Sequence, residues 1–237
     1  MQYWPVRVRQ GAAKGALWTV LPFSANWRRG GEGDLEAALA VTAKLQGSCV
    51  WDLGAHFGIY TVGLAMTVGP TGEVAAFEPD PMAFERLRRH IRMNNLWWVK
   101  LFQAGVGAEE AVGDLILNED AGSTYSHLRY EDEPEPDKSN TIRIRMLCLD
   151  RMVDRGEIGL PDLIKVDVQG HGAKVLLGAK KSIETKRPTI LFSSHSPWEL
   201  NCSRAILEPM GYRAFDLNGA PISWEGLEFE TAIFKCP

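Results

Sequence analysis

The chain has 237 residues, of which 45% are hydrophobic and 24% are charged, and its net charge at pH 7 is -4. That length fits one domain of ordinary size, or one domain with an appendage. The hydrophobic share is large enough to build a core, which excludes a disordered tail. The slightly acidic balance excludes the global basic excess of a nucleic-acid-binding protein, so no nucleic-acid partner is expected.

The cysteines and the first residues indicate the cellular compartment in which the protein works. None of the four cysteines forms a CxxC pair or has a nearby histidine at zinc spacing, so we expect reduced thiols in a cytoplasmic protein. The first ten residues, MQYWPVRVRQ, lack the apolar core of a signal peptide. No apolar run approaches the roughly 20 residues of a membrane span, so no membrane partner is expected. The cysteines are Cys49, Cys148, Cys202 and Cys236.

Residues 1–46 carry mixed signals and are expected to cap a main domain that spans residues 47–237. The segment MQYWPVRVRQG can hold a short strand, and Asp34 is a plausible N-cap of a helix over residues 34–46. Loop signals lie between them at Pro22, Asn26 and the Gly30-Gly31 pair. We expect this cap to close over a cofactor or an acceptor molecule.

Strands and helices alternate from residue 47 onward. Asp80 and Pro81 have the residue types of an N-cap and a first helical position. An order of strand, helix, strand, helix, strand predicts a parallel sheet with right-handed crossovers, which is an α/β fold. The predicted strands cover residues 48–55, 74–79 and 99–107, and the predicted helices cover residues 56–68 and 80–95.

The pattern changes after residue 107. Residues 113–120 and 141–150 alternate as antiparallel strands do, and the acidic, proline-containing segment 130–140 between them reads as a solvated loop. The chain then returns to long apolar strands and helices. We predict strands at 161–170, 188–195, 212–219 and 228–236, and helices at 173–186 and 197–211.

The end of the first predicted strand reads VWDLGAHFGIY, with glycines at positions 54 and 58. Glycines there indicate either a ligand pressed against the backbone or tight packing of strand and helix. The G-x-x-x-G spacing differs from the G-x-G-x-x-G of dinucleotide sites, and Asp52 suits a cationic amino-acid group. Glu78, which ends the second strand, has two acceptor oxygens that match a ribose diol. A nucleoside that carries an amino acid and no phosphate is S-adenosylmethionine (SAM).

Three segments together resemble the FkbM family of SAM-dependent methyltransferases: VWDLGAHFGIYTVGLA, GEVAAFEPDPMAFERLRRHIRMNNL and PDLIKVDVQGHGAKVLLGA. The resemblance covers roughly residues 47–195. It implies the Rossmann-like class I methyltransferase fold, a mostly parallel sheet of seven strands with the last antiparallel and helices on both faces. It also implies O-methylation of a hydroxyl on a sugar or another natural product, with a small-molecule acceptor as the partner.

The resemblance also implies which residues hold the cofactor. His56 stands where the family often has Asn, and Gln103 falls where an Asn that touches adenine is common. Asp167 matches the acid that ends the fourth strand beside the methyl group. The implied cofactor-binding set is Asp52, Gly54, Ala55, His56, Gly58, Glu78, Pro79, Gln103, Val106 and Asp167.

The chain departs from the family where it reads DVQGHG, because the family usually reads Asp-Val-Glu-Gly-x-Glu. Gln169 and Gly172 stand in place of two carboxylates, and LFSSHS lacks the Glu that often follows the fifth strand. A site with fewer acids is a poor site for a divalent metal, so no metal is expected. The departures also leave the usual substrate and mechanism open.

Methylation of a hydroxyl needs a proton acceptor, and we propose His195 or Asp167. The alternatives are a histidine without a catalytic role at a helix start and an acid that caps a turn. Gln169 and His171 are weaker catalytic candidates on the same turn. Aromatic side chains are assigned by position: Trp27 and Trp198 to the acceptor pocket, and Trp51, Trp97 and Trp98 to the core. Arg28 and Arg29 suit an anionic acceptor or a solvated loop.

Three other functions stay open on the sequence. The same fold methylates RNA or protein, although the acidic balance counts against RNA. A SAM-binding protein without catalysis would suit the missing carboxylates. A dehydrogenase is disfavoured by the glycine spacing. The oligomeric state is also open, and a homodimer is common among methyltransferases of this size.

Overall fold

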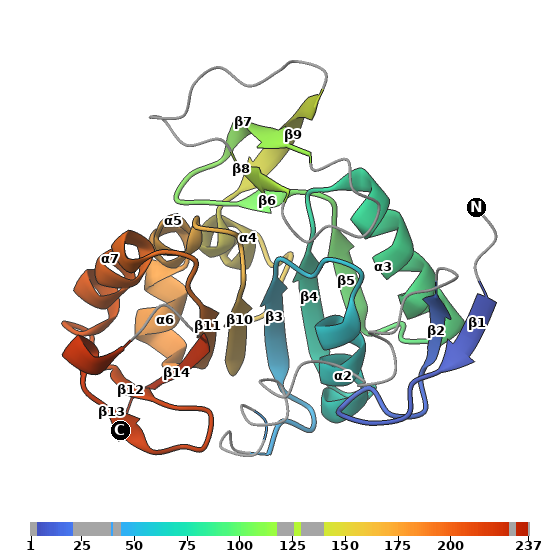
Figure 1. Ribbon diagram of the computed structural model, residues 1–237, viewed down its shortest axis with the longest axis horizontal. Coiled ribbons are helices and arrows are strands. Elements are labelled where there is room, and N and C mark those ends of the chain that lie inside the picture. Colours follow the sequence, from blue (N-terminus) through green and yellow to red (C-terminus); the bar gives the residue numbers. More distant parts are fainter. Residues whose placement is uncertain are drawn as a thin grey trace.

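The predicted strands and helices build one central sheet in the computed structural model of the protein (Figure 1). The structure describes residues 4–20, 39, 44–117, 126–128, 140–227 and 231–236. Within these residues the sheet has eight strands, in the order β13-β12-β14-β11-β10-β3-β4-β5. They are β3 Cys49–Leu53, β4 Glu73–Phe77, β5 Val99–Phe102, β10 Leu163–Val166, β11 Thr189–Ser193, β12 Arg213–Phe215, β13 Pro221–Ile222 and β14 Thr231–Lys235.

The strand order reverses beside β3. The strands β4 and β5 follow on one side and β10 and β11 on the other, and all five are parallel. In such a sheet, ligands bind at the carboxyl ends of the strands near the reversal. The strand β14 runs antiparallel between β11 and β12, as predicted. The predicted total of seven strands is wrong, because Pro221–Ile222 pairs with β12 as a short edge strand, β13.

Helices cover both faces of the sheet because successive strand residues point to opposite sides. Val50 and Leu163 pack in one cluster with residues of α2 and α3. Their neighbours Trp51 and Ile164 pack in a second cluster with residues of α4 to α7. The predicted α/β class is therefore confirmed. The helices are α2 Ile59–Val68, α3 Pro81–Met93, α4 Leu149–Asp154, α5 Gly172–Gly178, α6 Lys180–Lys186 and α7 Pro197–Leu207, with a short 3₁₀ turn at Trp224–Gly226.

The start of α3 confirms a predicted cap. The side chain of Asp80 accepts hydrogen bonds from the backbone N–H groups of Met82 and Ala83, at 2.8 and 3.1 Å. Pro81 occupies the first helical position, where a missing N–H costs nothing. An N-cap of this kind is worth about 1 kcal/mol.

The helix predicted over residues 173–186 is two helices, which meet at Ala179. Asp150 of α4 explains the break, because its carboxylate accepts the backbone N–H groups of Lys181 and Ser182 at 2.8 and 2.9 Å. These are N-terminal donors that a continuous helix would bond to its own carbonyls. The break therefore comes from a residue outside the predicted helix.

The strand predicted over residues 99–107 is also divided, between β5 and β6. The strand β6, Gly105–Val106, belongs to a second sheet of order β6-β9-β7-β8, with β7 Ala111–Ile116, β8 His127–Leu128 and β9 Thr141–Leu147. The pairing of β7 and β9 is antiparallel, as predicted. This small sheet lies beyond the carboxyl ends of the parallel strands (Figure 1). The predicted loop at 130–140 lies outside the described residues, except for residue 140.

The described part of the N-terminal segment is a hairpin of β1, Trp4–Arg7, and β2, Leu17–Val20. The first strand was predicted, whereas the second lies where loop signals were expected to begin. The hairpin packs on α3 through His90, whose Nε2 accepts from the backbone N–H of Thr19 at 3.1 Å and contacts the Thr19 hydroxyl at 2.6 Å. The Nδ1–H of His90 therefore donates to the carbonyl of Phe57, at 2.7 Å. The predicted helix at 34–46 lies outside the described residues, apart from residues 39 and 44–46.

The cysteines agree with a further prediction. All four cysteines are free thiols. In the parts of the chain that the structure describes, no helix is long and apolar enough to cross a membrane.

Candidate functional site

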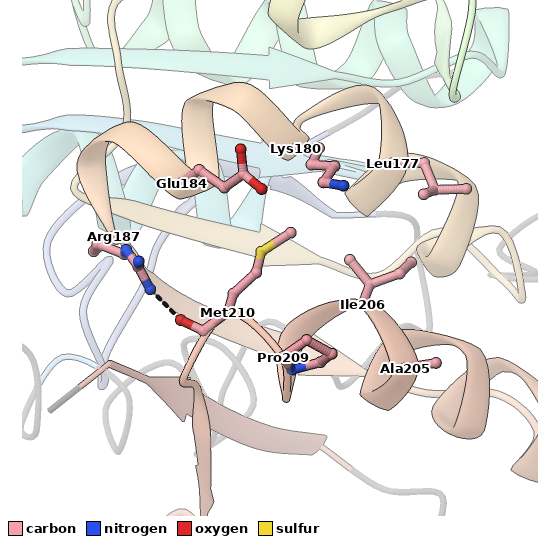
Figure 2. Close-up of a pocket in the computed structure, with 8 residues that line it drawn as sticks. All are labelled: Leu177, Lys180, Glu184, Arg187, Ala205, Ile206, Pro209 and Met210. Atoms are coloured by element: carbon pink, nitrogen blue, oxygen red, sulfur yellow. Dashed lines mark hydrogen bonds between the residues drawn. The ribbon is translucent and has the colours of Figure 1, made fainter.

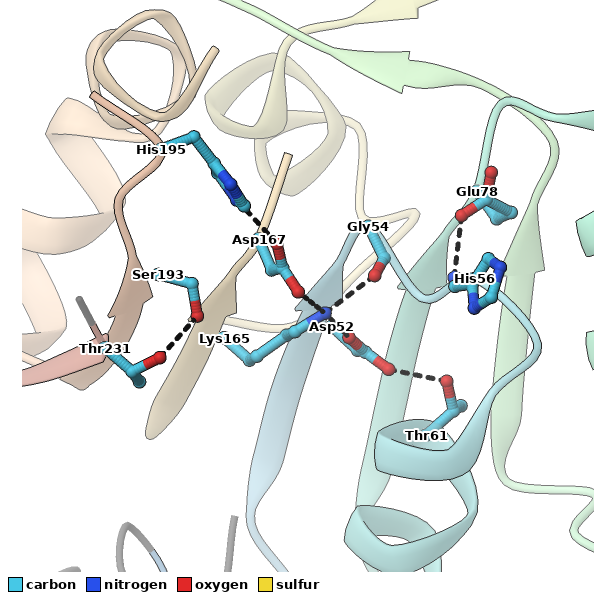
Figure 3. Close-up of polar contacts among 10 residues, drawn as sticks. All are labelled: Asp52, Gly54, His56, Thr61, Glu78, Lys165, Asp167, Ser193, His195 and Thr231. Carbon is cyan, nitrogen blue, oxygen red and sulfur yellow. Dashed lines mark hydrogen bonds and ion pairs between the residues drawn. The ribbon is translucent and has the colours of Figure 1, made fainter. Parts of the chain in front are cut away.

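The carboxyl ends of four neighbouring strands gather ionisable side chains at one edge of the sheet (Figure 3). Asp52 lies on β3, Glu78 follows β4, Asp167 follows β10 and His195 lies beyond β11. Ionisable groups at the point where strand order reverses mark a candidate site in this class of fold.

The turn after β3 needs both of its glycines for packing. A Cβ on Gly54, whose φ is +79°, would lie 1.8 Å from the carbonyl oxygen of Asp167. A Cβ on Gly58, whose φ is +89°, would lie 2.3 Å from Leu87 of α3. The helix α2 consequently begins at Ile59, three residues later than predicted. Tight packing accounts for these glycines, so a ligand has to be argued from other residues.

Asp52 lies beneath this turn, fully buried, and contacts a cation of the chain itself. Its Oδ2 accepts from the Thr61 hydroxyl at 2.5 Å, and its Oδ1 lies 3.3 Å from the Lys165 ammonium. The sequence suggested an amino-acid cation beside Asp52, and in this structure the cation there is Lys165.

Lys165 joins the two sides of the site and was not predicted. Its ammonium donates to the carbonyl of Gly54 at 2.6 Å and lies 3.7 Å from Asp167, so it stands between two acids (Figure 3). Burial acts to lower the pKa of Lys165, but the charges of Asp52 and Asp167 outweigh burial and hold it above its usual value. A lysine inside the apolar run LIKV was the available signal, because a buried lysine is rarely unpaired.

Glu78 is almost fully buried, and backbone donors contact both of its oxygens. The N–H of His56 donates to Oε2 at 2.7 Å and the N–H of Asp80 donates to Oε1 at 2.8 Å. Burial raises the pKa of Glu78 to about 7, against the opposing effect of these two hydrogen bonds. Each carboxylate oxygen has a second lone pair, so Glu78 can also accept from a ligand diol.

His56 presents a buried ring nitrogen at the same turn. Its backbone is left-handed, with φ of 50°, and its ring lies against Phe57 at a tilt of 30°, with centroids 3.7 Å apart. Burial, together with the charges of Lys165 and Arg86, lowers the pKa of His56 to about 4, so the ring is neutral. Its Nε2 is buried and has no hydrogen-bond partner among the described residues. Buried polar atoms are normally bonded, so this atom fits a site for a polar ligand.

Asp167 and His195, the two predicted base candidates, form a hydrogen-bonded pair. The distance from His195 Nε2 to Asp167 Oδ1 is 2.9 Å. Burial acts to raise the pKa of Asp167, but Lys165 and His195 lower it to about 2, so the carboxylate is ionised. The hydrogen bond that His195 donates to Asp167 raises the pKa of His195 against the effect of burial. Nε2 therefore carries the proton that Asp167 accepts, and Nδ1 is the basic nitrogen of the neutral ring.

The weaker candidates lie on the turn after Asp167. Gln169 is left-handed with φ of 49° and Gly170 follows with φ of 89°, and His171 is buried at the start of α5. Glu199 of α7, which was not predicted, is fully buried and accepts the backbone N–H groups of Gly172 and His195, at 2.6 and 2.8 Å.

The other predicted cofactor residues surround the turn. Ala55 is buried, and its N–H donates to the carbonyl of Phe77 at 2.9 Å. Pro79 is half-buried and Gln103, after β5, is exposed. Val106 lies in β6 and is buried in the core. No contact decides whether these four residues reach a cofactor.

The predicted aromatic side chains divide by environment. Trp51 is buried, and Trp98 donates its indole N–H to the carbonyl of Ala65 at 2.9 Å. Trp97 was predicted in the core and is 76% exposed, because it lies on the turn that joins α3 to β5. Trp198 is 60% exposed at the start of α7. Residues 27–29 lie outside the described residues.

A groove of about 570 Å³ lies away from this edge, between the helices α5 and α6 and the end of α7 (Figure 2). The helix α7 begins at the candidate site, whereas the groove lies at its far end. Its lining is Leu177, Lys180, Glu184, Arg187, Ala205, Ile206, Pro209 and Met210. None of these is a predicted site residue.

Comparison with known proteins identifies the family of this chain. Residues 52–214 match the model of the methyltransferase FkbM domain. The hexuronic acid methyltransferase AglP of Haloferax volcanii is 25% identical over 181 residues, which are 72% of this chain and 66% of that protein. The crystal structure of a methyltransferase FkbM from Methylobacillus flagellatus superposes with a TM-score of 0.55 at 18% identity, over 84% of this chain and 47% of that one. The chain thus spans about half to two thirds of these two relatives.

Proposed function

This chain belongs to the methyltransferase FkbM domain family, and we propose that it transfers a methyl group from SAM to an oxygen of a small molecule, in particular a sugar hydroxyl. The observation that carries the proposal is the His195–Asp167 pair, at 2.9 Å, on the sheet edge that also holds Glu78 and His56. The name of the Haloferax volcanii relative supports a sugar acid as the acceptor.

Glu78 and His56 fit the nucleoside part of SAM. Glu78 has lone pairs left for the two ribose hydroxyls, and His56 offers a neutral ring nitrogen that lacks a partner among the described residues. Gly54, Ala55, Gly58 and Pro79 would face the cofactor around the turn, and Gln103, which is exposed after β5, would contact the adenine, whereas Val106 would support them from the core. Asp52 supports the turn through Lys165, which donates to the carbonyl of Gly54.

The proposed reaction moves one methyl group and one proton. SAM, when bound, supplies the methyl group on its sulfonium. His195 Nδ1 accepts the proton of the acceptor hydroxyl, and the ionised Asp167 stabilises the resulting imidazolium through Nε2–H. The side chain of His195 is 31% exposed, so this proton can leave to water. A positioned base of this kind contributes roughly 10²–10⁴-fold to the rate.

A hexuronic acid offers two kinds of acceptor oxygen. Its hydroxyls must lose a proton when they are methylated, whereas its carboxylate carries none at neutral pH. A base hydrogen-bonded to an ionised acid is useful only for a hydroxyl. We therefore propose an ether product, and mild alkali distinguishes it because alkali cleaves methyl esters and leaves methyl ethers intact.

The first test of the cofactor is calorimetric titration of SAM, of its demethylated product and of NAD into the purified chain. We expect SAM and its product to bind, NAD not to bind, and Glu78→Gln to weaken SAM at least about tenfold, since hydrogen bonds to a charged group are lost. Glu85→Gln is the matched control, because Glu85 is an exposed acid of α3 that pairs with Arg88. Absence of SAM binding in a folded chain would contradict the proposal.

The test of the acceptor is a panel assayed by mass spectrometry with uronic acids, neutral sugars, a short RNA and a peptide. Methylated sugar would support the proposal, and methylated RNA or peptide would replace the substrate class. SAM binding with no product from any of them would favour the non-catalytic SAM-binding alternative.

A further inference from the structure

Glu199 is a fully buried carboxylate that the proposed reaction does not use. It lies in the first turn of α7, where Ser196 caps the helix by accepting the N–H of Glu199 at 3.1 Å. Its own carboxylate reaches back past the start of the helix to His195, the residue before the cap. One oxygen accepts the N–H of Gly172 at 2.6 Å and the other accepts the N–H of His195 at 2.8 Å.

These two N–H groups belong to the two loops that carry the proton-transfer pair. Gly172 begins α5, five residues after Asp167, and His195 lies between β11 and α7. A single rigid side chain thus ties the loop of Asp167 to the loop of His195. Hydrogen bonds from backbone N–H to a buried carboxylate are strong, charge-assisted contacts, so this clamp limits how far the two loops can separate.

The glycine at position 172 makes room for this clamp. A Cβ there would lie 2.7 Å from Glu199 Oε1 and 2.4 Å from the ring of Phe192. Glu199 therefore occupies the space where a side chain of residue 172 would begin. The segment DVQGHG has no acid at position 172, and α7 supplies a buried acid at the same place.

We propose that Glu199 is a positioning residue for methyl transfer, because its carboxylate holds the His195 ring on Asp167 with Nδ1 directed to the acceptor. The proposal rests on the proposed function. Glu199 itself touches neither acceptor nor cofactor and acts through His195.

The charges that face His195 determine in which direction its pKa should shift when Glu199 is replaced. Asp167 raises the pKa of His195 by its hydrogen bond and its charge, Glu199 raises it by its charge, and Lys165 lowers it. Loss of the Glu199 charge and a looser contact with Asp167 both lower the pKa of His195. Loss of the charge alone lowers this pKa whatever the role of Glu199, so a variant that keeps the charge is needed to isolate the looser contact.

The experiment compares Glu199→Gln with Glu208→Gln. Glu208 ends α7 and pairs with Arg204 on the surface, so its replacement removes the same charge from the same helix without touching the clamp. The His195 ring is titrated by NMR without cofactor or acceptor, and its signal is identified by its loss in His195→Gln. In Glu199→Gln we expect a lower His195 pKa, so the rise of the rate with pH should shift to lower pH. We also expect kcat to fall about tenfold or more. SAM affinity should stay within about twofold, since Glu78 and His56 are untouched.

A second variant keeps the test decisive if Glu199→Gln does not fold. Glu199→Asp keeps the charge but is too short for both N–H groups, so it should lower kcat while leaving most of the charge effect on the His195 titration. Glu199 variants whose His195 titration and kcat match those of Glu208→Gln would overturn the proposal. With Glu199→Asp, the chain could also show a shifted His195 titration and yet neither bind SAM nor methylate any acceptor. This result would overturn the proposed function, but Glu199 would still be shown to position His195.

Discussion

Two carboxylates at the same sheet edge differ both in burial and in protonation: Glu78 is 7% exposed, whereas the side chain of Asp167 is 33% exposed. Glu78, after β4, accepts two backbone N–H groups, and burial raises its pKa to about 7. Asp167, after β10, is held at a pKa of about 2 by Lys165 and His195, although burial acts in the opposite direction. Burial therefore dominates at the more deeply buried Glu78, whereas Lys165 and His195 outweigh the weaker burial of Asp167.

This contrast divides the site by task. His56 and Glu78, at the turn after β3 and the end of β4, are neutral or readily neutralised, and they suit a ligand that brings its own charge. The ends of β10 and β11 carry an ionised acid hydrogen-bonded to a histidine, which suits proton transfer. Lys165 lies between them and contacts both Gly54 and Asp167.

Removal of the Lys165 charge should have the largest effect, which is on the stability of the fold. Lys165→Met leaves Asp52 fully buried without a counter-charge, so the free energy of unfolding should fall by about 3–5 kcal/mol. Urea denaturation at pH 8 measures the change. The double variant Asp52→Asn with Lys165→Met removes both charges and should recover most of the loss. A single variant as stable as the wild type would mean that the pair does not hold the two sides together.

Removal of the proposed base should affect the rate and leave the cofactor side alone. In His195→Gln we expect kcat to fall roughly 10²–10⁴-fold, with SAM affinity unchanged by calorimetry. The wild-type rate should rise with pH through a pKa above the usual histidine value of 6.5, because the neutral ring is the active form. His127→Gln on the small sheet is the control. Equal rates for the two variants would remove His195 from the mechanism.

The raised pKa of Glu78 predicts a pH dependence of cofactor binding. If the ionised form accepts the ribose diol, SAM affinity should rise about tenfold from pH 6 to pH 8. Calorimetry across this range measures it, and Glu78→Gln should abolish the dependence. The effect of pH on the stability of the fold has the opposite sign. In the folded chain Glu78 keeps its proton up to about pH 7, whereas in the unfolded chain it loses the proton near its usual pKa of 4.5. Glu78 therefore lowers the stability of the fold as pH rises from 4.5 to 7. A flat affinity would show that Glu78 does not face the ribose.

The smallest expected effect concerns the acceptor. Trp198 is 60% exposed, three residues after His195, and an aromatic face at that place suits a sugar ring. In Trp198→Ala we expect the acceptor KM to rise about fivefold, the equivalent of roughly 1 kcal/mol, with kcat nearly unchanged. Trp97→Ala, which removes a similarly exposed ring from the far end of α3, is the control. An unchanged KM would exclude Trp198 from the acceptor pocket.

The sequence predicted what depends on neighbours along the chain. The cap at Asp80, the parallel core and the antiparallel strands β7 and β9 all follow from local patterns. The predicted helix over 173–186 fails because Asp150, a residue of another helix, accepts the N–H groups at the break. Local patterns carry no information about such a contact.

The candidate site shows the same limit. His195 and Asp167 were predicted separately, and their pairing across 28 positions could not be. Lys165 and Glu199 were missed because each acts on backbone groups of distant segments, at Gly54, Gly172 and His195. The sequence left open whether Gly54 contacts a ligand or is needed for tight packing. The carbonyl of Asp167, which leaves no room for a Cβ at position 54, shows that packing requires this glycine.

His90 has a consequence for what counts as a complete folding unit. Its neutral ring, with a pKa lowered to about 4 by burial, connects Thr19 of the N-terminal hairpin to the carbonyl of Phe57 in the glycine turn. The region that defines the family begins at residue 52. A fragment cut there would lose three residues of the central strand β3 together with the hairpin, so the ring of His90 would lose both Trp18, which stacks on it, and its donor Thr19. The smallest autonomous unit therefore begins before the family domain does, at the hairpin that supports the turn from behind.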